Sequence, residues 1–486
     1  MHKTSLFASI IALCLSSVLA AAPRLTVFVL VDGITETNMQ QLRPYWSQGG
    51  LRTLSEEGFK TALSYPHLLF GGDETTATLM TGATPLKSGY TTDYTFNRSD
   101  RTAHLFLEDK QVEGIGTDLQ LSPQALLTTT LSDRLRLHYP DAKIYAIGLR
   151  PTTTVLMAGH GADACCWLDG TTKRWVTSAY YRLGLPAEAD SENMTGRIDD
   201  ICTRTWIPSM SVSSYLHPTA EEKKKGFSYA AGSYLLHTPY ANTLAIELAL
   251  NIQQKQYLGT DATPDLLLLH LTTLSPQACS DAIETAEQED MYISLNRDLG
   301  WLMEQLDRRI GRTNYQIAVI GLPRLGGSSK ALEQLHMSSQ EFNTERAAAL
   351  LNTYLMAFYG HERWVDGYCG SAIFFNRTLM EQKRLDLTTV QRQAANFLME
   401  FAGVEMAYIP ADIIVQPRLL ASFNKRNMGD VIFTLEPFWH LTPTKTQGLY
   451  IDEEPTTSPL LYRPAGTKHY PAESLQATEL NSLLEL

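Results

Sequence analysis

Short apolar runs rich in β-branched residues constrain the fold of this chain more than any other feature of its sequence. The run at 25–31 reads LTVFVLV and ends at Asp32 and Gly33, which is typical of a buried strand that meets a turn. Further runs of this kind lie at 144–149, 265–271, 315–320, 371–375 and 430–435. Because they are continuous rather than alternating, they indicate strands that are buried on both faces.

Helical patterns separate these runs. One follows Asn242 and Thr243, which form a plausible N-cap, and the others lie at about 290–306 and 388–401. Strands that alternate with helices predict an α/β fold, with a mostly parallel sheet sandwiched by helices.

Two polar stretches, near 92–126 and 186–230, lack this rhythm. We interpret them as cap insertions on one large α/β domain that spans 23–486. The charged run EEKKK at 221–225 predicts a solvated surface.

Residues 1–22 have the features of a signal peptide. Lys3 supplies the positive charge, 6–15 form an apolar stretch, and 18–22 read VLAAA, which is typical of a cleavage site. We therefore expect an exported protein, in the periplasm or on the cell surface of a bacterium.

The cysteines after residue 22 would then meet an oxidising compartment. They are Cys165, Cys166, Cys202, Cys279 and Cys369. One or two disulfides are expected, and Cys165 or Cys166 with Cys202 is the nearest option, but the sequence leaves the connectivity open.

Composition excludes some classes of protein. Asp and Glu number 52 against 40 Lys and Arg, a net charge of -12, so we expect no nucleic-acid partner. No stretch after residue 22 approaches 18 unbroken apolar residues, so we expect no membrane span. The expected partner is a protein or a small-molecule ligand whose identity the sequence does not reveal.

Several segments along nearly the whole mature chain carry a resemblance to a known family. They are VFVLVDG at 27–33, GGLRTLSEEGF at 49–59, MTGATPLKSGY at 80–90, and the stretches 128–136, 157–175, 236–249, 289–307, 379–398 and 429–437. With them the chain resembles the alkaline phosphatase superfamily, in particular bacterial phosphate-irrepressible alkaline phosphatases and type I phosphodiesterases/nucleotide pyrophosphatases. The resemblance implies two zinc ions held by Asp and His, and a Thr or Ser nucleophile.

The metal positions implied by the resemblance are mostly replaced. Asp32 keeps the first metal-binding Asp. The other ligand positions, two Asp–His pairs and a final His, fall on Ser275, Cys279, Leu322, Pro323 and Thr457. Leu and Pro cannot bind a metal, and one thiol beside a serine makes a poor zinc site.

The nucleophile position implied by the resemblance falls on Gly72, which has no hydroxyl group. A shift in register would bring Thr75, Thr76 or Thr78 to that position instead. The Asn that contacts phosphate in the family aligns with Asp93, and the Lys-x-Arg pair aligns with Arg150 and Thr152. His160 belongs to a matching segment, and we expect it to pack or to cap.

These replacements predict a pseudoenzyme with a binding or assembly role, with no catalytic residues, no metal and no cofactor. The alternative is an active zinc-dependent phosphomonoesterase or phosphodiesterase with a rearranged site. A third hypothesis is a different reaction in the same cleft, using Asp32, Asp93, Arg150, Ser275 and Cys279 for general acid–base chemistry.

Overall fold

A computed structural model describes residues 22–70, 72–276, 283–323, 340–436, 439–442, 457–466 and 475–483. The segment 1–21, with most of the predicted signal peptide, and Cys279 lie outside the described residues. None of the described helices is both long and apolar enough to cross a membrane.

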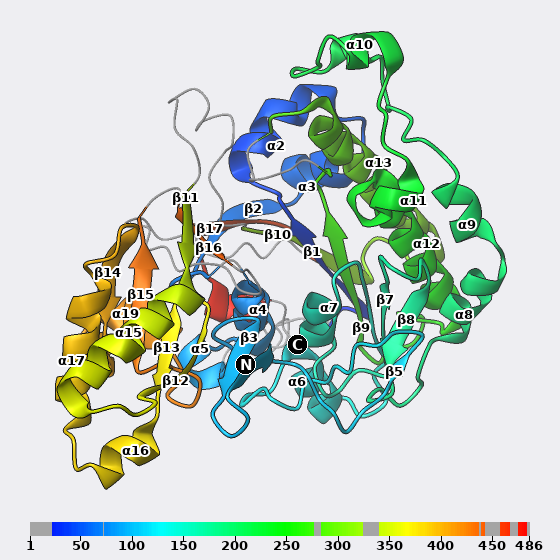
Figure 1. The fold of residues 1–486 in the computed structure, drawn as a ribbon. Coiled ribbons are helices and arrows are strands. Elements are labelled where there is room, and N and C mark those ends of the chain that lie inside the picture. The colour runs from blue at the N-terminus through cyan, green and yellow to red at the C-terminus, as the bar shows by residue number, and fades with distance from the viewer. Residues whose placement is uncertain are drawn as a thin grey trace, which may run out of the picture.

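A ten-stranded mixed sheet forms the centre of the molecule (Figure 1). Its strands, in spatial order, are β18 (Leu475–Gln476), β2 (Phe59–Ser64), β17 (Thr457–Arg463), β10 (Tyr315–Leu322), β1 (Leu25–Asp32), β9 (Asp265–Thr272), β6 (Ile144–Gly148), β7 (Ala164–Leu168), β8 (Trp175–Ser178) and β5 (Gly114–Ile115). The five central strands, from β10 to β7, are parallel, and β17 and β8 flank them in antiparallel pairing.

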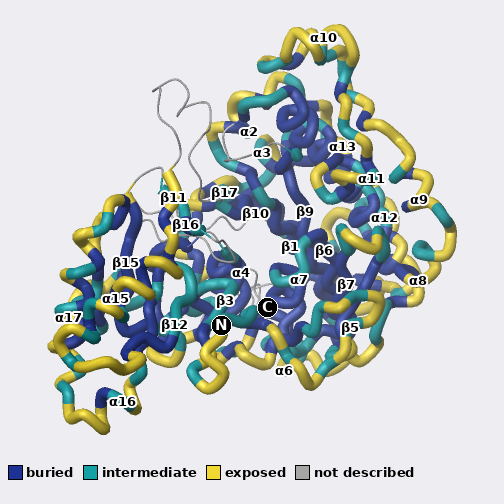
Figure 2. The backbone as a smooth tube through the Cα atoms, in the orientation of Figure 1, coloured by how far each residue is buried: buried dark blue, intermediate teal, exposed yellow. Residues whose placement is uncertain are grey.

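Both faces of this sheet are covered, because alternate residues of each strand enter different cores. On β1, Val27 and Val29 pack with α3 (Gly50–Glu57), α12 (Pro239–Lys255) and α13 (Ala286–Arg309). Phe28 and Leu30 face the other side, where α4 (Glu74–Thr81), α6 (Leu131–His138) and α7 (Pro151–Ala158) lie. The buried strands form the dark interior in Figure 2. The predicted sandwich of helices around a sheet is confirmed.

Two predicted strands do not join this sheet. The runs at 371–375 and 430–435 become β13 (Ala372–Phe375) and β15 (Val431–Leu435) of an antiparallel four-stranded sheet with β12 (Val365–Cys369) and β14 (Val404–Tyr408). This second sheet has its own apolar core with α15 (Thr344–Tyr359) and α17 (Leu387–Leu398), and it lies to one side of the central sheet in Figure 1. Placing all six runs in one sheet was wrong, because an apolar run indicates a strand but not its partner.

The predicted insertions are polar segments with short elements. The first contains the hairpin of β3 (Tyr94–Asn97) and β4 (Thr102–Leu105), together with β5 of the central sheet. The second contains α8 (Ala187–Met194), α9 (Arg197–Cys202), η2 (Val212–Ser214) and α10 (Glu222–Lys225), and most of its charged run is exposed (Figure 2).

The remaining elements are short. They are α2 (Glu36–Leu42), η1 (Arg43–Tyr45), α5 (Pro85–Ser88), α11 (Ala231–Tyr234), η3 (Leu235–His237), β11 (Gln340–Asn343), α16 (Arg377–Gln382), α18 (Pro410–Ile414), α19 (Pro417–Ser422), β16 (Trp439–Thr442), η4 (Ala477–Glu479) and α20 (Leu480–Leu483).

Two local predictions need correction. The helix expected after Asn242 begins at Pro239, because proline is favoured in a first helical turn, and Thr238 is its N-cap. Asn242 lies inside the helix and binds the backbone of Thr272 instead. The expected disulfide is also wrong within the described residues, where Cys165, Cys166, Cys202 and Cys369 are all free thiols.

Candidate functional site

Asp32 ends β1 and is the first member of a buried polar cluster at the carboxyl ends of the central strands. Its Oδ2 atom lies 3.2 Å from Nη1 of Arg150 and 3.1 Å from Nε2 of His270. His270 is on β9, which pairs with β1, and only 1% of it is exposed. The carboxylate that would be a metal ligand in the family therefore has two partners from this chain.

The hydrogen bonds of His270 indicate its tautomer. The backbone N–H of Leu149 donates to Nδ1 of His270 over 3.3 Å, so Nδ1 carries no proton. Nε2 then carries the proton and donates to Asp32. His270 is thus a neutral donor that orients Asp32.

Asp73 is the second carboxylate of the cluster, and 1% of it is exposed. It occupies the N-cap position of α4, yet its side chain makes no capping hydrogen bond. It instead accepts hydrogen bonds from Nη2 of Arg150 and from Oγ1 of Thr153, both over 2.6 Å, and from the hydroxyl of Thr152. The two positions that the resemblance assigns to phosphate contacts, Arg150 and Thr152, thus both bind an internal carboxylate.

Arg150 stands between Asp32 and Asp73 because it is the N-cap of α7, whose first turn starts at Pro151. Burial alone would lower the pKa of Arg150, but the charges of Asp32 and Asp73 raise it above its ordinary value. The guanidinium is therefore a fixed cation that both carboxylates share.

Gly72 and Asp93 lie against each other beside Asp73. Oδ1 of Asp93 accepts hydrogen bonds from the backbone of Asp73 over 2.7 Å and from the hydroxyl of Tyr90 over 2.8 Å. A Cβ atom on Gly72 would collide with this carboxylate and lie 2.8 Å from its Cγ atom. The absence of a side chain at the nucleophile position is thus structurally linked to the carboxylate at residue 93.

Glu74 adds a third acidic side chain beside Asp73 and Asp93. It is buried and accepts hydrogen bonds from the backbone of Phe70 over 2.5 Å and of Gly72 over 3.0 Å. Burial, and then the charge of Asp93, raise the pKa of Glu74 to about 8. Burial and the charge of Asp73 also raise the pKa of Asp93. Among the described residues, the carboxylates of Asp32 and Asp73 alone outnumber the guanidinium of Arg150, so a phosphate group would meet net repulsion here.

The remaining predicted ligand positions do not complete a metal site. Leu322 is the residue of β10 that pairs with Asp32, and it is buried in the apolar core. Pro323 follows it and is half-buried, and Thr457 is exposed at the start of β17. Ser275 is buried, and its hydroxyl has no hydrogen-bond partner among the described residues.

The donor set therefore does not fit the two zinc ions that the family implies. Within the described ranges, no three His, Cys, Asp or Glu side chains are grouped so that they could hold a metal ion. The Oδ2 atom of Asp32 instead accepts a hydrogen bond from Nε2 of His270 and pairs with the guanidinium of Arg150.

The alternative nucleophiles lie in the body of α4. Thr75, Thr76 and Thr78 are all buried, and the hydroxyl of Thr78 contacts Nε2 of His67 at 2.8 Å. His160 lies outside the cluster, where its Nδ1 contacts Asp133 at 2.8 Å and its backbone donates to the same carboxylate.

Sequence analysis missed Asp73, Glu74, Thr153 and His270. Two signals could have indicated the three titratable residues among them: an acidic pair directly after the nucleophile position, and one histidine inside an otherwise apolar strand. Asp32 also has partners that its position in the sequence does not reveal. Its partners come from segments more than 100 residues away, as the separation of 238 residues from His270 shows.

The fold is an α/β sandwich with a polar cluster at the carboxyl ends of its central strands. No family model matches the chain. It is 26% identical over 452 residues to a calcium-transporting ATPase of Myroides odoratus, covering 86% of this chain and 82% of that protein. It is 22% identical over 443 residues to the alkaline phosphatase PafA of Elizabethkingia meningoseptica, covering 84% and 80%.

The crystal structure of PafA shares the fold, with a TM-score of 0.83, 20% identity and 96% of both chains covered. The chain is thus similar, over most of its length, to proteins of the alkaline phosphatase superfamily, which is the resemblance that its sequence segments indicated.

Proposed function

We propose that this protein is an exported, non-hydrolytic member of the superfamily that acts by binding. The observation that carries the proposal is the internal carboxylate of Asp73, which binds Arg150, Thr152 and Thr153. The groups that would contact a phosphoester are thereby already paired. A phosphoester would have to displace a charge-assisted set of hydrogen bonds.

The residue types at the reacting positions support the same proposal. Gly72 offers no oxygen for attack on phosphorus, and Asp93 would repel the negative oxygens of the substrate. Leu322 and Pro323 offer no metal donor.

The rival proposal is an active phosphomonoesterase or phosphodiesterase with a rearranged site. The names of its relatives favour it, because PafA and PhoV are alkaline phosphatases. A different acid–base reaction that uses Asp32, Asp93 and Arg150 is the weaker third candidate. It would need one of these groups to release its present partner.

One preparation tests the first two proposals. The mature protein, purified without chelator and soaked in zinc, is analysed for metal by mass spectrometry and assayed with para-nitrophenyl phosphate and bis(para-nitrophenyl) phosphate. We expect no stoichiometric zinc and no turnover above a buffer control. About two zinc ions per chain, with turnover that Asp32→Ala abolishes and the exposed control Asp118→Asn retains, would establish the rival.

Export has its own test. A cell fraction that contains the mature protein is analysed by intact mass. Processing near residues 21–23 and recovery outside the cytoplasm are expected. Full-length protein in the cytoplasm alone would contradict this part of the proposal.

A further inference from the structure

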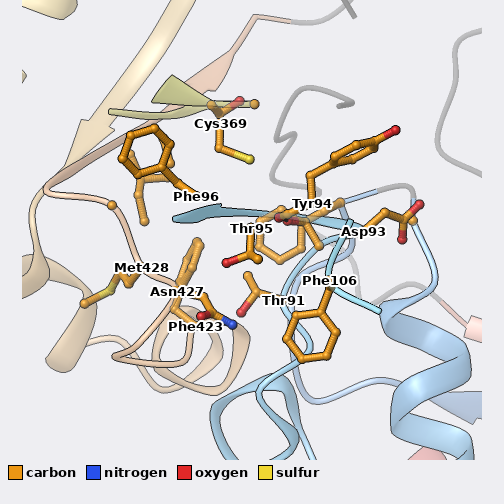
Figure 3. Close-up of a pocket in the computed structure, with 18 of the residues that line it drawn as sticks. Thr91, Asp93, Tyr94, Thr95, Phe96, Phe106, Cys369, Phe423, Asn427 and Met428 are labelled. Atoms are coloured by element: carbon orange, nitrogen blue, oxygen red, sulfur yellow. Dashed lines mark hydrogen bonds between the residues drawn. The ribbon is translucent and has the colours of Figure 1, made fainter. Parts of the chain in front are cut away.

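A cavity of about 290 Å³ adjoins the acidic cluster, between the β3–β4 hairpin and the second sheet. It shares Gly72 and Asp93 with the cluster. Figure 3 shows Asp93 and Tyr94 on one side of it, and Phe96 and Met428 on the other. Its volume is close to the lower end of small-molecule sites, about 300 Å³, and exceeds the roughly 150 Å³ that holds a benzene ring.

Aromatic contacts hold the walls of this cavity in place. Phe96 of the hairpin stacks on Phe374 of the second sheet, with ring centroids 4.4 Å apart. Phe70, beside the cluster, packs edge-on against Phe423 at 5.3 Å. Rings from segments far apart in the chain thus pair with each other, and these contacts between side chains of the protein itself shape the walls of the cavity.

Asp93 gives the cavity its electrostatic character. Among the described residues that line the cavity, it is the only one whose side chain carries a charge. Its Oδ1 atom is used by Asp73 and Tyr90, whereas Oδ2 accepts no hydrogen bond from the described part of the chain. Arg150, a cation whose charge acts on Asp93, is already paired with Asp32 and Asp73.

We propose that this cavity binds a small aromatic amine, with its ring among the phenylalanine side chains and its ammonium group at Asp93. The proposal rests on the proposed function, since it requires that the cleft no longer serves phosphate. An ammonium group supplies the donor that Oδ2 lacks and the charge that the carboxylates need. The aromatic walls also favour a cation over an anion, because ring faces carry partial negative charge.

The specificity follows from the same charges. A carboxylate of equal size would place like charges together and find no donor at Asp93. A neutral alcohol could donate to Oδ2 without the ionic attraction, so it should bind with intermediate affinity. This order of affinities, cation over neutral ligand over anion, is opposite to that expected of a phosphate-binding site.

Calorimetric titration of the mature protein at neutral pH tests this order with three matched probes. They are 2-phenylethylamine, 2-phenylethanol and 3-phenylpropionate. We expect the amine to bind about tenfold or more tighter than the carboxylate, a difference of about 1.4 kcal/mol, with the alcohol between them. Equal affinities, or preference for the carboxylate, would overturn the proposal.

Asp93→Asn should abolish the preference for the amine over the alcohol while retaining alcohol binding. Asp118→Asn, a change of an exposed carboxylate outside the cavity, is the matched control and should leave the order unchanged. If Asp93→Asn kept the full preference for the amine, the assigned contact would be wrong.

A free thiol in the cavity allows binding of the amine to be located in the unmodified protein. Cys369 lines the cavity, whereas Cys202 is a half-buried thiol outside it. The amine should slow the alkylation of Cys369 by iodoacetamide and leave that of Cys202 unchanged, as followed by peptide mass spectrometry. Equal rates for Cys369 with and without the amine would overturn the location.

Zinc content and phosphoester turnover are measured on the same preparation. Turnover with bound zinc would contradict the proposed function itself. If the protein neither hydrolyses phosphoesters nor prefers the amine, only the ligand class assigned to the cavity would be contradicted.

Discussion

The carboxylate of Asp73 lies 2.6 Å from Nη2 of Arg150, and the other amino group of that guanidinium lies 3.2 Å from Asp32. One arginine thus joins the ends of β1 and the start of α4 through two carboxylates. The guanidinium of Arg150 thus balances part of the negative charge of these two carboxylates.

Asp73→Asn should increase the affinity for inorganic phosphate. The change removes the negative charge that occupies Arg150, Thr152 and Thr153, and one repulsion at about 4 Å is worth several kcal/mol at an effective dielectric constant of about 20. We expect an increase of about tenfold or more, measured by calorimetric titration with phosphate. Asp118→Asn is the control, and an unchanged affinity in Asp73→Asn would show that Asp73 does not compete with anions.

Gly72→Thr should destabilise the protein, although it restores a hydroxyl at the nucleophile position. The new Cβ would collide with the Asp93 carboxylate, which Tyr90 and the Asp73 backbone hold in place. We expect a loss of about 1–3 kcal/mol in the free energy of unfolding, as for other overpacked sites.

Urea denaturation of Gly72→Thr, Asp93→Ala and the double variant tests this coupling. In Asp93→Ala the obstructing carboxylate is gone, so the cost of Gly72→Thr should fall by at least about 0.5 kcal/mol. Simple additivity of the two single changes would contradict the steric link.

Glu74 should make the protein less stable as the pH rises from about 5 to 8. Burial raises the pKa of Glu74 from its ordinary 4.5 to about 8, so in this window the folded chain binds a proton that the unfolded chain has released. The free energy of unfolding therefore falls with rising pH, by at most about 1.4 kcal/mol per pH unit for this group.

Thermal unfolding of Glu74→Gln across this range isolates the effect. The melting temperature of the variant, relative to the unmodified protein, should rise between pH 5 and 8 because glutamine does not titrate. Glu304→Gln, a change on the exposed face of α13, should show no such trend. A parallel pH dependence of Glu74→Gln and the unmodified protein would refute the assignment.

Asp430→Asn should be strongly destabilising. Asp430 is fully buried beside β15 and accepts from Arg98 of the first insertion, Arg377 and the backbone of Phe375. The substitution removes charge-assisted hydrogen bonds at a buried acceptor, which costs about 1–3 kcal/mol because the two arginines are partly exposed and can be hydrated.

Asp412→Asn is the matched control, since Asp412 pairs with Arg392 near the surface. An exposed pair contributes at most about 1 kcal/mol, so a small change is expected in urea denaturation. Equal effects of the two substitutions would show that the Asp430 cluster does not hold the hairpin to the second sheet.

Sequence reasoning identified the strands because each buried strand leaves a local apolar run. It placed Asp32 correctly at the carboxyl end of β1, next to Leu322 at the end of β10. It did not assign β13 and β15 to a separate sheet, because pairing depends on residues such as Val404 and Val365 that are distant in the chain. It also missed the role of Asp73, because an aspartate before a helix normally predicts a cap.

The sequence by itself determined which chemical groups this protein has: Gly72 has no hydroxyl group, and Leu322 and Pro323 have no metal donor. Only the tertiary structure decided what the remaining polar groups do. Asp73 and Arg150 are 77 residues apart, and Asp32 and His270 are 238 residues apart. Charge pairing and burial act over a few ångströms in space, so they become visible only when the chain has brought such residues together.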